Sequence, residues 1–329
     1  MLTFLVSAIR LGMTFLLGST GETITEKSGH LNLGVPGIMC VGASCGCFVE
    51  AVYLSTVPVR QEIPLLAVLL PILAALIGGA LMGLLFSFFT VTLRANQNVT
   101  GLAITTLGIG ISNYIIDKAD DYGRFARATK HFTAPLVGEE VVEWFEEIGL
   151  GWFGELFLSY GIFVWLALAI AIGTSLVFNR TRVGLHLRAV GENPATADAA
   201  GINVTRYRYV ATCIGCAIVG LGGLSFIMDY LNGQWEYCVD TIGWLAVALV
   251  IFTLWRPILA IFGSIVFGAL YIASSRLTTL GVEMTLADKE LFRMLPFAVT
   301  ILVLVVTSIF SKKNQPPAGL GLPYFREER

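Results

Sequence analysis

The chain has 329 residues, of which 56% are hydrophobic and only 13% charged, and its formal net charge is −2. Soluble domains carry about 25% charged residues, so a mean hydropathy of +0.78 excludes an ordinary water-soluble fold. The near-neutral charge also excludes the strong positive field of a nucleic-acid-binding protein. We therefore predict an all-α polytopic membrane protein, embedded in a lipid bilayer, that forms one domain over residues 1–329.

Nine apolar stretches follow one another along the chain and are predicted to be transmembrane helices. A helix needs about 20 apolar residues to cross a hydrocarbon core of about 30 Å. The expected spans are 2–20, 32–54, 64–93, 98–116, 158–179, 206–228, 239–254, 257–275 and 294–311. The first stretch lacks the basic start and the small-residue cleavage site of a signal peptide, so we expect it to remain as a helix.

The second span is predicted to be broken near its start, where Gly34, Pro36 and Gly37 interrupt the apolar sequence. Irregular backbone at membrane depth is tolerated only where protein or a water-filled path satisfies its polar groups. The segment 21–31 and Asn32 are therefore expected to form a polar, flexible entrance to a pathway. Helix-packing glycines beside a hydrogen-bonded asparagine are the competing interpretation.

The charges of two loops orient the spans. The loop 180–208 holds five arginines against two acidic residues, whereas the loop 117–157 holds nine acidic residues. Because positively charged loops stay in the cytoplasm, we predict that 180–208 is cytoplasmic and that 117–157 is extracytoplasmic. The N-terminus is then outside and the C-terminus is cytoplasmic.

The loop 180–208 contains the most specific local signal, a short helix of about two turns. Asn193 can accept the free N–H groups of a first turn, Pro194 suits the first helical position, and Gly201 can adopt the left-handed conformation that ends a helix. Such a small, alanine-rich helix can fit a groove on another protein; a capped loop without a partner is the alternative. The residues of this candidate site are Gly191, Glu192, Asn193, Pro194, Ala197 and Gly201.

Uncharged polar residues in the spans are candidates for contact with a transported solute. Polar groups inside a membrane are costly, and they are functional candidates by default. These amides and hydroxyls suit a solute rich in hydroxyl and amide groups, and interhelical hydrogen bonding is the alternative role for each. The candidates are Asn32, Asn98, Thr100, Thr105 and Asn113.

No catalytic, metal or cofactor site is predicted. Cys213 and Cys216 form a C-x-x-C pair, but no second pair or nearby histidine completes a zinc site. The sequence has no G-x-x-x-x-G-K-[ST] loop with which to bind ATP. We therefore expect a transport protein rather than an enzyme.

Several stretches resemble the permease subunits of bacterial nucleoside and simple-sugar ABC importers, within the branched-chain amino-acid permease superfamily. The main ones are 26–37, 94–103, 190–208 and 243–257, and they follow the order expected for the family. Thr253 stands where glycine is expected, and the loop 117–157 is longer than expected.

The resemblance implies a permease in the bacterial plasma (inner) membrane whose short helix, 194–200, is a coupling helix on a separate ABC ATPase subunit. It also implies a second permease subunit in a heterodimer and an extracytoplasmic substrate-binding lipoprotein. Nucleosides are the expected solutes, with riboflavin or simple sugars as alternatives. The rival class is an ion-coupled secondary transporter, which should carry acidic or basic pairs deep in its spans; the sequence indicates only Arg10 there.

Overall fold

The computed structural model describes residues 2–58, 61–119, 126–237, 239–279, 285–310 and 316–325, and these form helices joined by short loops without any strand. Three of the elements are π-helical turns, labelled η. In chain order the elements are α1 (Leu2–Lys27), α2 (Val35–Thr56), α3 (Pro64–Ser87), η2 (Phe88–Thr92), α4 (Gln97–Asp117), α6 (Thr129–Thr133), α7 (Glu139–Glu147), α8 (Gly151–Phe153), η3 (Gly154–Leu158), α9 (Ile162–Arg180), α10 (Arg182–Glu192), α11 (Pro194–Ala199), α12 (Val204–Ser225), η4 (Phe226–Tyr230), α13 (Val239–Phe252), α14 (Pro257–Thr279), α15 (Leu286–Arg293) and α16 (Leu295–Phe310).

The all-α membrane architecture is confirmed, and a helix lies in each of the nine predicted stretches. Within the described residues, seven helical stretches are long and apolar enough to cross a membrane. The other two predicted spans correspond to α13 and α16. The 14 residues of α13 reach only about 21 Å at 1.5 Å per residue, so the count of nine spans stays a prediction.

The predicted break inside the second span is wrong, because the irregular backbone lies between two helices. α1 continues to Lys27, seven residues beyond its predicted end, and α2 starts only at Val35. Pro36 lies in the first turn of α2, where its missing N–H leaves no bond unmade. Residues 28–34 therefore form a short connection, and most of them are buried in the protein.

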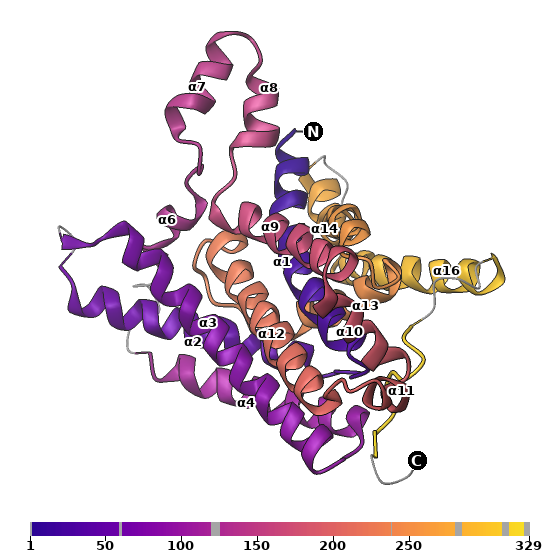
Figure 1. Ribbon diagram of the computed structural model, residues 1–329. Helices are drawn as coiled ribbons and strands as arrows, with labels where there is room; N and C mark the ends of the chain where they lie inside the picture. Colours follow the sequence, from indigo (N-terminus) through magenta and orange to yellow (C-terminus); the bar gives the residue numbers. More distant parts are fainter. Residues whose placement is uncertain are drawn as a thin grey trace.

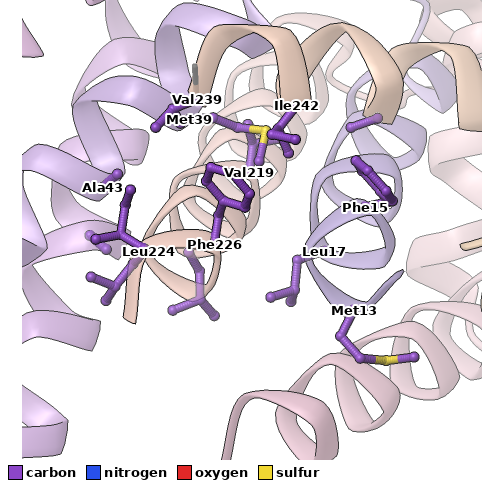
Figure 2. Close-up of a cluster of buried hydrophobic side chains, with 14 of the residues drawn as sticks. Met13, Phe15, Leu17, Met39, Ala43, Val219, Leu224, Phe226, Val239 and Ile242 are labelled. Atoms are coloured by element: carbon purple, nitrogen blue, oxygen red, sulfur yellow. The ribbon is translucent and has the colours of Figure 1, made fainter. Parts of the chain in front are cut away.

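α12 lies at the centre of the bundle and packs against α1, α2 and α3. Glycines allow this close packing: a Cβ atom on Gly42 of α2 would lie 2.2 Å from the Cα of Gly220 in α12, and one on Gly79 of α3 would lie 2.3 Å from the Cys216 carbonyl oxygen. Figure 2 shows side chains of α1, α2, α12 and α13 meeting in this core, among them Phe15 and Met39.

The two ends of the bundle carry different segments (Figure 1). α7 and α8 project from the end at which α1 begins, while α10, α11 and residues 316–325 lie at the opposite end. α10 and α11 of the arginine-rich loop and α7 and α8 of the acidic loop therefore lie at opposite ends, as the predicted topology requires.

Candidate functional site

The predicted short helix is present as α11, with the predicted signals at both of its ends. The Asn193 side chain accepts a hydrogen bond from the Thr196 N–H at 3.0 Å, and Pro194 is in the first helical position. Gly201 has a φ of +81°, the left-handed conformation in which glycine is favoured. α10 precedes it and is capped in the same way by Thr181, whose Oγ1 accepts from the Gly184 N–H at 3.1 Å.

The prediction that Ala197 faces a partner protein is wrong. Its side chain is 3% exposed and packs with Val190 of α10 and Val204 of α12. The short helix turns this residue inward because one of its faces must cover the apolar groups beneath it. The exposed residues of α11 are Ala195, Thr196 and Ala199.

A returning segment, residues 316–325, packs against α10 and α11. The Gly319 N–H donates to the Gly191 carbonyl at 2.9 Å, and the Ala318 N–H donates to the Glu192 carboxylate at 3.1 Å. Gly191 is also packed so closely that a Cβ atom there would lie 2.3 Å from the Lys27 carbonyl oxygen. Gly191 and Glu192 thus join α10 to the rest of the chain.

A cluster of buried polar residues lies where α1 ends. Glu22 is buried and its carboxylate accepts from both the backbone and the side-chain amide of Asn32, each at 3.3 Å. One turn later, Glu26 accepts from the indole N–H of Trp255. Trp255 has a φ of +56°, a conformation that non-glycine residues rarely adopt. These contacts connect α1 with the connection before α2 and with the turn between α13 and α14.

The segment 21–31 is therefore not the exposed, flexible entrance predicted from the sequence. His30 is fully buried, and its Nδ1 atom lies 2.9 Å from the Thr212 hydroxyl of α12. Burial lowers the pKa of His30 well below its ordinary value, and the nearby Arg208 guanidinium lowers it further, so the ring is neutral at pH 7. The polar residues of this segment hold the connection in place.

The five solute-contact candidates fall into two groups. Asn32, Thr100 and Thr105 are buried, and the Thr105 hydroxyl donates to the Leu33 carbonyl at 2.8 Å, so at least Asn32 and Thr105 have internal partners. Asn98 is exposed and Asn113 is half-buried, and both lie on α4. Thr106 of α4 is also exposed. The structure thus separates the candidates into a buried set (Asn32, Thr100 and Thr105) and a more exposed pair on α4 (Asn98 and Asn113).

An ion pair was missed from the sequence. Arg10 of α1 lies 3.1 Å from the carboxylate of Asp229 in η4, and its guanidinium also donates to the Asp229 carbonyl. Asp229 was not recognised because it follows a long apolar stretch with no nearby basic residue in sequence. This pair removes the argument that paired charges are absent from the spans. The choice between an ABC permease and an ion-coupled transporter therefore rests on other findings.

Glu22 and Glu26 were also missed, although their spacing of four residues places them on one face of a helix. The signal was hidden because the first span was predicted to end before them. Across the described residues, no group of three or more histidine, cysteine, aspartate or glutamate side chains is arranged to hold a metal ion.

A helical bundle with seven long apolar helices in the described residues is the architecture of a multi-pass membrane protein. Residues 4–304 match the family described as the branched-chain amino acid transport system permease component, and the chain belongs to this family.

Three relatives align with almost the whole chain. The guanosine ABC transporter permease protein NupQ of Bacillus subtilis is 30% identical over 95% of this chain and 93% of its own length. The putative glucose ABC transporter permease protein TsgC13 of Haloferax volcanii is 29% identical over 98% of this chain and 97% of its own. The nucleoside ABC transporter permease protein NupC of Lactococcus lactis is 30% identical over 94% and 92%. The predicted resemblance is confirmed, and the chain is a permease subunit of the ABC importer type.

Proposed function

We propose that this chain moves nucleosides inward across the bacterial plasma membrane as one of two permease subunits, driven by a separate ATPase subunit. The observation that carries the proposal is the capped helix α11, which exposes Ala195, Thr196 and Ala199 at one end of the bundle while its buried side packs on α10 and α12. A small, rigid and exposed helix of this kind can transmit the movement of a partner. The chain itself then needs no ATPase site and no cofactor.

The solute is inferred from the relatives and from α4. Two of the three relatives are named for guanosine or nucleosides, and the third for glucose, so a sugar is the second candidate. Asn98, Thr106 and Asn113 are seven or eight residues apart on α4, which places them on one face. Lipid would be a poor neighbour for this polar face. We place it along the solute path, opposite the second permease subunit.

The neighbouring long helix α3 supports this placement of the path by contrast. The exposed residues of α3 are all apolar along its length, for example Leu69, Leu73 and Ile77, as expected for a helix that faces lipid. The exposed surface of α4 instead carries both polar and apolar side chains. A path between two subunits would use the amide and hydroxyl groups of α4 to bind the polar edge of a nucleoside.

The coupling proposal is tested with Thr196→Arg in the complete importer. Thr196 is exposed on α11 and its side chain makes no described hydrogen bond, so the variant should fold normally but lose solute-stimulated ATP hydrolysis and retain less ATPase subunit on purification. The matched control is Gln61→Arg, another exposed position, three residues before α3 begins. Full coupling in Thr196→Arg would contradict the role of α11.

The orientation is tested with single cysteines in a cysteine-free background. Glu140→Cys on α7 and Ala200→Cys after α11 replace exposed residues at opposite ends of the bundle. We expect a membrane-impermeant maleimide to label Glu140→Cys in intact cells and Ala200→Cys only after permeabilisation. The reverse pattern would place α11 outside, where no ATPase could reach it. This outcome would also contradict the assignment of 117–157 as extracytoplasmic and of 180–208 as cytoplasmic.

A further inference from the structure

A basic pocket lies beside α11, at the end of the bundle that also holds residues 316–325. Its volume is about 620 Å³, and it is bounded by the end of η2, the first turns of α12 and the side chain of Tyr324. Three of its lining residues are arginines, namely Arg94, Arg206 and Arg208. None of the functions described above uses this pocket.

The positive charge of the pocket is poorly neutralised. Its one acidic lining residue, Asp198, accepts a hydrogen bond from the Tyr324 hydroxyl at 2.9 Å. In the part of the chain that the structure describes, no salt bridge joins the three arginines to a carboxylate. Arg208 is only 2% exposed; one of its Nη atoms donates to the Leu322 carbonyl at 3.4 Å, and its Nε atom is buried without a hydrogen-bond partner. Such a buried, unpaired donor is costly, and an anion in the pocket would compensate the charge of the guanidinium that carries it.

An apolar groove continues from the basic pocket along the outer surface of the bundle. It is lined by Leu81, Leu84, Leu85 and Phe88 of α3 and η2. Tyr209 belongs to both the groove and the pocket, so the two surfaces are continuous. Leu81 and Leu84 are 60% and 48% exposed although they are wholly apolar. The groove therefore suits a hydrocarbon chain that lies along α3.

We propose that this composite surface is a binding site for an anionic phospholipid. The arginines bind the phosphate of the headgroup, and one acyl chain occupies the groove between Leu81 and Phe88. Basic pockets between helices at the membrane surface are known to suit anionic headgroups. The pocket alone would also accept a soluble phosphate, but only a lipid occupies the pocket and the groove together. Because Gly201 and Asp198 line the pocket, the lipid contacts the segment that carries α11.

The test uses the full chain in detergent, titrated with dioleoyl phosphatidylglycerol while thermal unfolding is followed. We expect this lipid to raise the melting temperature more than dioleoyl phosphatidylcholine or glycerol 3-phosphate does. In Arg206→Gln the half-saturating concentration of phosphatidylglycerol should rise about fivefold, the factor that corresponds to about 1 kcal/mol for each basic residue near an anionic surface. The matched control is Arg182→Gln, an exposed arginine of α10 outside the pocket.

A photoactivatable phosphatidylglycerol with its reactive group on the acyl chain provides the second readout. Cross-links should map to the peptide containing Leu81–Phe88 and should decrease in Arg206→Gln but not in Arg182→Gln. The proposal is overturned if both variants weaken lipid binding equally, since that shows a general surface charge effect. It is also overturned if glycerol 3-phosphate stabilises the protein as well as the lipid does, or if the cross-links spread over all apolar helices.

Discussion

Gly191→Ala is expected to push the end of α10, and α11 after it, away from the end of α1. The added Cβ atom would lie 2.3 Å from the Lys27 carbonyl oxygen and 3.3 Å from the Gly29 nitrogen. Both are backbone atoms, so α10 must move by about 1 Å to restore an ordinary contact, and overpacking of this kind costs about 1–3 kcal/mol. Replacing a helical glycine with alanine also stabilises the helix by about 1 kcal/mol, because alanine has the higher helix propensity. The net effect is a destabilisation of up to about 2 kcal/mol.

Gly173→Ala in α9 is the matched control, because a Cβ atom at Gly173 would meet nothing within 4 Å. It should gain the same propensity without the contact. The melting temperature of the purified chain should fall by up to about 6 °C in Gly191→Ala and should not fall in Gly173→Ala. Solute-stimulated ATP hydrolysis of the assembled importer should decrease only in Gly191→Ala. If Gly191→Ala melted at or above the temperature of Gly173→Ala, the packing argument would be refuted.

Three further outcomes follow from the contacts described above. Gly201→Val should lower the free energy of unfolding by about 1–2 kcal/mol, because a β-branched residue resists the positive φ that follows α11. It should also lower the melting temperature and coupled ATP hydrolysis, and Gly201→Asn should recover much of both losses. Arg10→Gln leaves the Asp229 carboxylate without its cation and should destabilise the chain by about 3 kcal/mol, the low end for a buried pair since Arg10 is 26% exposed; Arg10→Lys should melt closer to the parent. Thr106→Leu combined with Asn113→Leu should reduce nucleoside uptake without changing the melting temperature, and unchanged uptake would remove α4 from the solute path.

The positions of the helices were predictable from the sequence because each long apolar stretch has few alternatives to a membrane helix. α11 was predictable for another reason: Asn193, Pro194 and Gly201 each favour a helix end through local backbone chemistry. Such signals depend on neighbouring residues only. They can therefore be identified without any knowledge of tertiary contacts.

The failures have the opposite cause. Whether Ala197 faces inward depends on Val190 and Val204, and whether Glu22 is buried depends on Asn32 and the distant turn at Trp255. Hydropathy placed Glu22 in an exposed loop because a carboxylate is normally solvated. Long-range hydrogen bonds determine these positions, and no local pattern shows which distant donor will satisfy a buried carboxylate.

The return of residues 316–325 to α10 and α11 has a consequence for biogenesis. The Gly319 bond to Gly191 and the Tyr324 bond to Asp198 join the last described segment to elements that are synthesised more than one hundred residues earlier. α10 and α11 therefore lack these contacts until residues 316–325 have been synthesised. In a chain interrupted before Pro316, α11 would be held by fewer contacts, so its final position is reached only after synthesis has passed α16.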